Sequence, residues 1–465
     1  MRIFFSVGEP SGDLHGSNLI QRLKSQDPSL EFVGYGGPKM QAAGCELHFE
    51  LTTMAVMFLE ALKSIRFFFK LVGQADEYFK TNQVDAVVLI DYPGFNWWIA
   101  RKAKKHNIPV FYYGIPQVWA WAPWRVRKIR KLVDHVICKL PFEVEWFAKR
   151  KCHATYVGHP YFDQLESQKY DEAFVAKVSG TQTQSSAGAS SVSSAESNSS
   201  QRLLTLLPGS RDQEVRNVLP ILIDSVKLIL EETKDCKVAI ASYNQRQQEM
   251  SQKILNEAIE SDIVSSNGQP GISPLSKIEI YVGKTPELMK AAHVCIACSG
   301  SVSMELLHHR KPTVIVFKVK RWVMFVQSFM LITKFITLVN LIAAKDIRKR
   351  TWRPYCPDRD EPSYAESKQG DDRPRAVMPE YLTSGNPSKK VASRIQILLN
   401  DEEVYQAKKE EMNSLAIKYA KSGATNRAAD YILTELKKLP QSKRLAETLS
   451  TSNAGQKDTS ERRAA

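Results

Sequence analysis

Short apolar runs alternate with longer stretches of helical periodicity along most of this chain. The apolar runs of the first part predict strands at residues 3–7, 31–34, 86–90, 110–113, 133–138 and 154–157. Those of the second part predict strands at 203–207, 238–242, 278–282, 294–297 and 313–317. Strands separated by helices are typical of parallel sheets that are covered on both faces. The pattern therefore predicts an α/β fold of two doubly wound, Rossmann-like domains that face a ligand cleft.

Changes in composition mark the expected domain boundaries. A stretch rich in Ser, Gly and Thr at 178–200 predicts a disordered linker. A stretch rich in charge and proline at 348–375 predicts an inserted loop. The predicted organisation is an N-terminal domain (1–177), the linker, a C-terminal domain (201–388), C-terminal helices (389–438) and a disordered polar tail (439–465). Many enzymes that use nucleotide sugars share this layout, although a layout alone does not establish a function.

The overall charge indicates the kind of partner. The 465 residues carry a formal net charge of +14, which favours phosphates, nucleic acid or an anionic membrane surface. The seven cysteines are sparse and odd in number, so we expect reduced cytosolic thiols. The N-terminus does not have the pattern of a signal peptide, because Glu9 and Asp13 interrupt a short apolar run.

The junction after the first strand is the first candidate site. The strand at 3–7 leads into Glu9, and a helix is expected to start on Ser11 and Asp13, which are good N-cap or first-turn residues. Open α/β sheets bind ligands outside the carboxyl ends of their strands. Glu9 is therefore a candidate for holding a polar ligand.

A second acid follows the buried strand at 86–90. Asp91 stands at the carboxyl end of this strand, where it could take a proton from an attacking hydroxyl. The alternative is an Asx-turn aspartate that caps the next segment. From this position alone the capping role is favoured.

The second domain carries two loops that suit a nucleotide. Gly209, Ser210 and Arg211 follow the strand at 203–207 and open a helix, so free N–H groups and a guanidinium fork could hold phosphates. The alternative is an ordinary turn with a surface arginine.

The other loop follows the strand at 294–297 and consists of Ser299, Gly300 and Ser301. Glu305 lies early in the next helix and could accept hydrogen bonds from ribose hydroxyls. Alternatively, it complements the helix dipole. The presence of two such loops in one domain favours nucleotide binding.

Residues 54–73 predict a helix at a membrane surface. Its apolar positions include Met57, Phe67, Phe68 and Phe69, and basic residues lie between them. A second apolar stretch, 322–344, is long enough to span a membrane, but its polar residues argue against a span. Burial in the protein core is the alternative for both stretches.

An aromatic and basic segment at 119–131 raises the question of nucleic acid. Its tryptophans could stack on bases. Because the segment lies inside a compact βα unit, a platform for a phosphorylated ligand or a membrane is favoured, and no nucleic-acid partner is expected.

Nine sequence motifs, in this order, resemble the lipid-A-disaccharide synthases, an inverting glycosyltransferase family with the two-domain GT-B fold. They are GEPSGDLHG (8–16), GYGGPKM (34–40), IDYPGFN (90–96), PQVWAW (116–121), LPFE (140–143), VGHP (157–160), LPGSR (207–211), SGS (299–301) with Glu305, and NLIA (340–343). They cover most of residues 1–382, and such an ordered series is highly specific.

The resemblance implies a reaction and a role for each motif. UDP-2,3-diacylglucosamine would donate its sugar to 2,3-diacylglucosamine 1-phosphate, forming a β-1,6-linked disaccharide and UDP. Asp91 would be the base that activates the 6-hydroxyl of the acceptor. Glu9, together with Ser11 of the helix that follows it, would lie on the acceptor side of the same crevice. Arg211 would neutralise the departing UDP, Glu305 would bind the ribose, and Asn340 would lie near the donor site. No metal or other cofactor is implied, and a homo-oligomer is left open.

The chain also departs from the family pattern. Phe58 replaces a glycine after Met57, which changes the expected membrane patch, and Glu380 arrives only after the 348–375 insert. Two other classes remain open. A UDP-sugar epimerase or hydrolase would turn over UDP-sugars without a lipid acceptor, and a basic membrane- or RNA-binding protein would need no Asp91.

Overall fold

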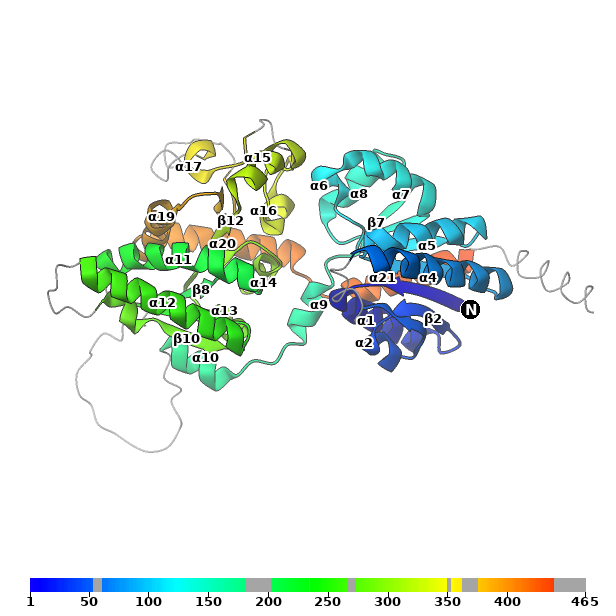
Figure 1. The fold of residues 1–465 in the computed structure, drawn as a ribbon, viewed down its shortest axis with the longest axis horizontal. Coiled ribbons are helices and arrows are strands. Elements are labelled where there is room, and N and C mark those ends of the chain that lie inside the picture. Colours follow the sequence, from blue (N-terminus) through cyan, green and yellow to red (C-terminus); the bar gives the residue numbers. More distant parts are fainter. Residues whose placement is uncertain are drawn as a thin grey trace, which may run out of the picture. The chain divides into compact units, whose positions relative to one another are not determined.

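The computed structural model describes residues 1–52, 61–180, 202–233, 235–265, 273–348, 353–361 and 375–438. It divides into two compact units (Figure 1). The first comprises Met1–Pro116, Trp124–Pro160 and the chain from Gly423 onward, and the second comprises Gln117–Pro123 and Tyr161–Ser422.

The first unit is built on a seven-stranded parallel sheet in the order β3-β2-β1-β4-β5-β6-β7. The strands are β1 (Arg2–Val7), β2 (Glu31–Gly36), β3 (Cys45–Glu50), β4 (Ala86–Ile90), β5 (Val110–Tyr113), β6 (His135–Cys138) and β7 (Ala154–Tyr156). The helices are α1 (Pro10–Gln26), α2 (Pro38–Ala42), α4 (Ala61–Thr81), α5 (Pro93–Lys105), α7 (Val126–Leu132), α8 (Pro141–Ala148) and α21 (Ala424–Lys438).

The last described helix completes the core of the first unit. Ala428, Ile432 and Leu436 of α21 are buried among apolar side chains of α1 and the sheet, including Leu19 and Ile20. Burying one such aliphatic side chain contributes about 1.5–3 kcal/mol. The chain therefore returns to its first unit at the end, which the expectation of one group of terminal helices at 389–438 did not include.

The second unit has a six-stranded parallel sheet in the order β10-β9-β8-β11-β12-β13. The strands are β8 (Arg202–Leu207), β9 (Cys236–Ser242), β10 (Glu279–Val282), β11 (Val294–Cys298), β12 (Thr313–Lys318) and β13 (Glu380–Thr383). The helices are α6 (Val118–Trp121), α9 (Tyr161–Glu166), α10 (Glu172–Ser179), α11 (Asp212–Glu232), α12 (Gln245–Ser265), α13 (Thr285–Ala291), α14 (Val302–His308), α15 (Arg321–Met330), α16 (Leu338–Ala343), α17 (Pro357–Asp360), α19 (Ser388–Asn400) and α20 (Glu402–Tyr419).

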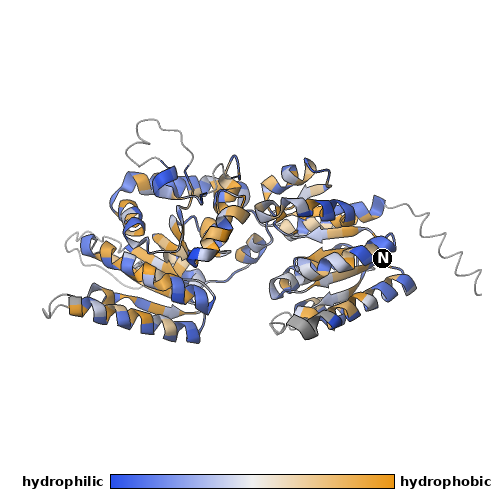
Figure 2. Ribbon diagram, turned by 45° about the horizontal axis from the view of Figure 1, so that its top comes forward, coloured by the Kyte–Doolittle hydropathy of each residue, from blue (hydrophilic) through white to orange (hydrophobic). Residues whose placement is uncertain are grey.

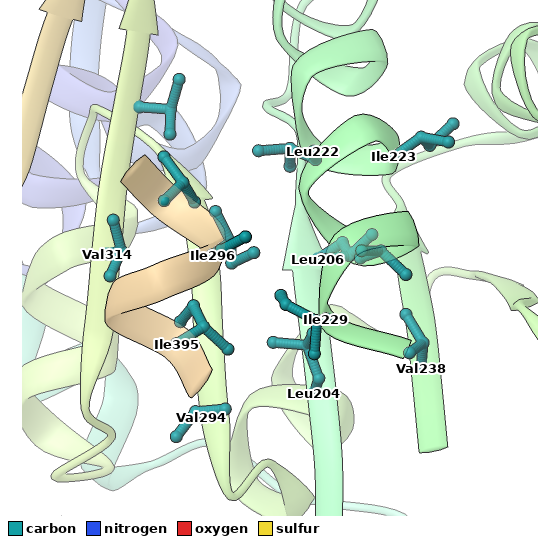
Figure 3. Packing of buried hydrophobic residues seen from close by; sticks show 14 of the residues in the cluster. Leu204, Leu206, Leu222, Ile223, Ile229, Val238, Val294, Ile296, Val314 and Ile395 are labelled. Carbon is teal, nitrogen blue, oxygen red and sulfur yellow. The ribbon is translucent and has the colours of Figure 1, made fainter. Parts of the chain in front are cut away.

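Aliphatic side chains from both the sheet and its helices fill the core of the second unit. Leu206 and Ile296 on neighbouring strands pack near Leu222 of α11 and Ile395 of α19 (Figure 3). Hydrophilic residues lie on the outer sides of the helices, and the strands between them are mostly hydrophobic (Figure 2). This distribution explains the nearly continuous apolar runs of the strands, since both faces of a parallel sheet are covered.

The order of the strands determines where each unit can bind a ligand. In the first sheet the order reverses between β1 and β4, which pair through Val7 and Ile90 at their carboxyl ends. In the second it reverses between β8 and β11, which pair through Leu207 and Ala297. Such reversals are the topological switch points at which open α/β sheets form their binding crevices. All four loops selected from the sequence begin at these two points.

The predicted fold class is confirmed, with local differences. All eleven expected strands are present, and β3 and β13 are additional. Residues 161–177 pack with the second unit rather than the first. Residues 181–201 of the expected linker, most of the 348–375 insert and the tail after 438 lie outside the described residues.

The apolar stretch at 322–344 does not form one continuous helix. It contains most of α15 and all of α16, with residues 331–337 between them. Across the described part of the chain, no helix combines the length and apolarity needed to cross a membrane.

Candidate active site

The turn after β4 has a strained backbone. Asp91 and Tyr92 both adopt left-handed conformations, with φ of 46° and 42°, which cost non-glycine residues about 1–3 kcal/mol each. The buried amide of Asn96 on α5 donates to the carbonyls of Ile90 and Asp91 at 3.2 and 2.8 Å. The hydroxyl of Tyr112 donates to the carbonyl of Asp91 at 2.6 Å. These bonds hold Asp91 in a conformation that would otherwise relax, a pattern that is common at functional sites.

Lys139, which the sequence reasoning missed, is the partner of the Asp91 carboxylate. Its ammonium lies 3.3 Å from Asp91 Oδ1, at the carboxyl end of β6. A Cβ at Gly114 would come within 3.0 Å of both groups, so the glycine keeps this space open. The Asp91 carboxylate therefore pairs with Lys139, while α5 has Tyr92 as its N-cap and no side-chain cap. The capping role that its position alone favoured is not the one observed.

Glu9 lies close enough to Asp91 for their charges to interact. Partial burial, followed by the charge of Asp91, raises the pKa of Glu9, and Lys139 lowers it. A Cβ at Gly8 would lie only 2.2 Å from the ring of Tyr92, so the β1 and β4 loops touch through this glycine. The two acids predicted from separate motifs are thus brought together at one switch point.

A neutral histidine lies in the same electrostatic environment. Burial, followed by the charge of Lys139, holds the pKa of His159 well below its usual range. His159 follows β7 at the carboxyl edge of the sheet, and its motif was noted in the sequence without a role. The edge therefore combines two carboxylates, an ammonium and an uncharged imidazole.

The start of α1 differs from the expectation. The helix begins at Pro10, with Glu9 as its N-cap residue, so it does not start on Ser11. Asp13 is buried and accepts hydrogen bonds from the backbone of Lys39 and Met40 at 3.1 and 3.0 Å. It therefore fixes the start of α2. Ser11 is exposed, and its predicted role towards the acceptor stays a prediction.

In the second unit, the loop after β8 binds the side-chain carboxylate of Glu214. Glu214 Oε2 accepts the N–H groups of Ser210 and Arg211 at 3.0 and 3.2 Å, and Oε1 pairs with the Arg211 guanidinium at 2.9 Å. The positive φ of Gly209, 119°, allows this tight turn. The N–H groups assigned to a phosphate are therefore engaged by a capping box. The Arg211 side chain is 81% exposed and is the part of the loop available to a diphosphate.

The loop after β11 opens onto space. A Cβ at Gly300 would meet no atom within 4 Å, and Ser299 and Ser301 flank it. Glu305 on α14 is 7% exposed, and its Oε2 accepts a hydrogen bond from the hydroxyl of Tyr161 at 3.0 Å. Burial raises the pKa of Glu305 to about 7, although the Tyr161 bond lowers it. Among the described residues, the hydrogen bond from Tyr161 to Oε2 is the one side-chain hydrogen bond that the Glu305 carboxylate accepts.

The raised pKa of Glu305 predicts a pH-dependent stability. Because the folded-state pKa of about 7 exceeds the unfolded value of 4.5, the folded protein binds more protons between these values. Its free energy of unfolding should therefore fall as pH rises through this window, by up to about 3 kcal/mol. Urea denaturation of the wild type and Glu305→Gln from about pH 4.5 to pH 8 measures this. A difference between the two proteins that stays constant with pH would contradict the prediction.

Asn340 is part of a buried polar network. Its amide donates to the Met378 carbonyl at 2.7 Å and to Glu380 Oε2 at 3.0 Å, and its oxygen accepts the Met378 N–H at 2.9 Å. Glu380 also accepts the backbone N–H groups of Ile336 and Thr337. Both the nitrogen and the oxygen of the Asn340 amide are thus bonded within the protein, and the expected donor-binding role of Asn340 stays a prediction. Asn340 joins α16 to β13.

The phenylalanine triplet of α4 is only partly at the surface. Phe67 packs on Phe49 at 5.1 Å between ring centroids, and Phe68 packs on Phe95 at 5.6 Å. Phe69 is 50% exposed and contacts Trp98. Phe69 is thus the most exposed ring of the three, and the assignment of the triplet to a membrane surface stays a prediction. Met57 and Phe58 lie outside the described residues.

The tryptophans of the segment at 119–131 differ in their burial, and Trp121 and Trp124 are both exposed. Trp119 on α6 is 2% exposed, so it offers no face for stacking. The carbonyl of Ala120 accepts the N–H of Ile332 at 2.8 Å within the second unit. Trp124, in the first unit, is 62% exposed and keeps a free surface beside the basic residues of α7.

Solved structures share this two-unit fold at very low sequence identity. A putative UDP-N-acetylglucosamine 2-epimerase from Listeria monocytogenes is 10% identical, with a TM-score of 0.53 over 95% of this chain and 97% of that one. A glycosyltransferase from Rickettsia africae is 10% identical, with a TM-score of 0.52 over 94% and 99%. At this level of identity the similarities show the GT-B type of fold and do not show the activity.

Sequence comparisons identify the family. The family model described as lipid-A-disaccharide synthetase matches residues 3–361. A lipid-A-disaccharide synthase from Coxiella burnetii is 32% identical over 74% of this chain and 82% of its own length. One from Syntrophus aciditrophicus is 28% identical over 94% and 98%. The chain therefore belongs to the lipid-A-disaccharide synthases, the glycosyltransferases that make the lipid A disaccharide.

Proposed function

We propose that the chain transfers the sugar of UDP-2,3-diacylglucosamine to the 6-hydroxyl of 2,3-diacylglucosamine 1-phosphate. The products are the β-1,6-linked disaccharide 1-phosphate and UDP. The observation that carries the proposal is the strained turn that presents Asp91 at the switch point of the first unit. A carboxylate held in this way suits a general base for a hydroxyl acceptor.

The proposed chemistry is a single displacement. Asp91 takes the proton of the acceptor 6-hydroxyl as that oxygen attacks C1 of the donor sugar. The bond from C1 to the diphosphate oxygen breaks, and its electron pair leaves with UDP. Attack from the side opposite to UDP inverts the configuration at C1. Lys139, 3.3 Å from Asp91, orients the carboxylate, and Glu9 lies on the acceptor side.

The second unit would bind the donor. Arg211 stabilises the charge that develops on the departing diphosphate, and Gly209 and Ser210 form the turn that presents the Arg211 side chain to it. Glu305 accepts the ribose hydroxyls beside Ser299, Gly300 and Ser301. No step requires a metal, because the guanidinium supplies the positive charge at the leaving group.

The test uses the purified full chain with both lipid substrates in EDTA. Disaccharide and UDP should appear in equal amounts. UDP formed without disaccharide would indicate a hydrolase, and conversion of a UDP-sugar to its 2-epimer would indicate an epimerase. Either result in place of disaccharide would overturn the proposal.

We further propose that the enzyme works on the cytoplasmic face of the bacterial inner membrane. Phe69 and Trp98 form an exposed aromatic pair with ring centroids 5.0 Å apart. Arg101 lies 4.5 Å from the centroid of the Trp98 ring, and Arg66 and Lys70 are exposed on α4. Aromatic side chains with a basic rim suit an interface of anionic lipid.

Replacing this pair should weaken membrane binding. We expect Phe69→Ser with Trp98→Ser to lower the affinity for anionic liposomes about tenfold, since two half-exposed aromatic rings no longer enter the interface. Tyr243→Ser, which changes an aromatic residue that is 67% exposed in the second unit, is the matched control. Liposome sedimentation measures the affinity. Equal binding of the double variant and the control would refute the proposal that Phe69 and Trp98 enter the membrane interface.

A further inference from the structure

A cavity of about 400 Å³ lies beside the Arg211 loop, within the second unit. The first turns of α11, the ends of β11 and β12, and the start of α15 line it, and it is open to solvent on one side. Its volume falls in the range of about 300–1,000 Å³ that is typical of small-molecule sites. Of the residues proposed to bind the nucleotide, Arg211 is the one in its lining.

The lining of the cavity is mixed. Val218, Phe317 and Val323 supply aliphatic and aromatic surface, and Arg211 and Lys318 supply positive charge. Polar side chains from the start of α11 also line it: Gln213, Glu214 and Asn217. Over its apolar part, uracil, ribose and phosphate would lose hydrogen bonds to water, which is costly. A hydrocarbon chain has no hydrogen bonds to lose and gains from burial.

α15 extends the apolar surface beyond the cavity. Trp322 lines the cavity and is 66% exposed, and Phe325 further along the same helix is 65% exposed. Exposed apolar patches of this kind mark sites of interaction. α15 therefore places further exposed aromatic surface next to the cavity whose lining includes Arg211.

We propose that this cavity and the adjoining face of α15 bind an acyl chain of the sugar-nucleotide donor. The assignment rests on the proposed function, because Arg211 then holds the diphosphate of the same molecule at the mouth of the cavity. The basic residues of the lining complement the diphosphate, and its apolar part complements the acyl chain. The enzyme thereby distinguishes an acylated donor from an ordinary UDP-sugar.

Equilibrium binding to the wild-type chain provides the first test. The probes are UDP and UDP-glucosamine derivatives with acyl chains of increasing length, each kept below its critical micelle concentration. Affinity should rise about fourfold for each methylene buried and level off when the cavity is full. Equal affinity for UDP and for the acylated donors would overturn the proposal.

Two valine substitutions provide the second test. Val323→Trp fills the cavity, whereas Val264→Trp makes the same change at an 80% exposed position of α12 that lines neither the cavity nor the face of α15. Val323→Trp should weaken binding of the acylated donor at least about tenfold, with UDP affinity unchanged. Val264→Trp should leave both affinities unchanged. Val323→Phe is the alternative if the larger ring prevents folding.

The outcomes separate this inference from the proposed function. If Val323→Trp loses affinity for UDP as well, the cavity holds nucleotide and the acyl assignment is wrong. If both tryptophan variants bind the acylated donor like the wild type, the cavity holds no acyl chain. A wild-type protein that binds acylated donors selectively but forms no disaccharide would contradict the proposed function alone.

Discussion

Asp91→Asn should lower kcat by about 10²–10⁴-fold while leaving the affinity for UDP unchanged. The amide keeps the size of the side chain but cannot take the proton of the acceptor hydroxyl, and general-base catalysis contributes this much to rate. UDP affinity should hold because the residues proposed to bind it lie in the second unit. Steady-state kinetics with both lipid substrates, together with calorimetry of UDP binding, measures the two effects separately.

The control for this variant is Glu46→Gln, an equivalent change at an exposed acid of β3. It should retain wild-type kcat. Lys139→Met should have a smaller effect than Asp91→Asn, because it removes only the group that orients the base. If Asp91→Asn retains near-normal kcat in a folded protein, another residue is the base.

Arg211→Ala should lower kcat by about 10²–10³-fold, comparable to the loss of one preorganised group that stabilises developing charge. The effect should fall on kcat as well as on KM, since charge grows on the diphosphate as the sugar leaves. Arg211→Lys should recover only part of the rate, because an ammonium lacks the planar fork that grips two oxygens. Donor kinetics at saturating acceptor measures both variants.

Arg216→Ala is the matched control, because it removes an exposed arginine from the same helix. Its kinetics should equal those of the wild type, which separates the role of Arg211 from the general positive charge. A loss in the control as large as that in Arg211→Ala would show a nonspecific electrostatic effect. The specific role of the guanidinium would then be wrong.

Most of the fold could be predicted because buried parallel strands have nearly continuous apolar sequences. β3 was missed because it lies at the edge of the sheet and has no continuous apolar run. Along it only Cys45 is buried, and half-buried and exposed residues alternate after it. β13 was missed because it begins with Glu380, an acid that is rare in strands. That acid is buried because it accepts the backbone N–H groups of Ile336 and Thr337, contacts that the sequence does not reveal.

The sites could be predicted only as far as strand ends locate them. Glu9 and Asp91 each follow a predicted parallel strand, so both were expected at the carboxyl edge of the sheet, and the family resemblance placed them in one crevice. The structure adds that the two strands, β1 and β4, are neighbours. Lys139 gave a weak signal, a lysine directly after a strand, and its pairing with Asp91 depends on the space at Gly114. The engagement of the Ser210 N–H group by Glu214 depends on loop geometry.

Product analysis by NMR tests the central claim most directly. The wild-type chain is incubated with UDP-2,3-diacylglucosamine and 2,3-diacylglucosamine 1-phosphate in EDTA, and the linkage of the purified product is determined. The account predicts a β-linked bond to the 6-oxygen of the acceptor, with one UDP released for each disaccharide. An α-linkage, attachment at another oxygen, or UDP release without disaccharide would contradict it.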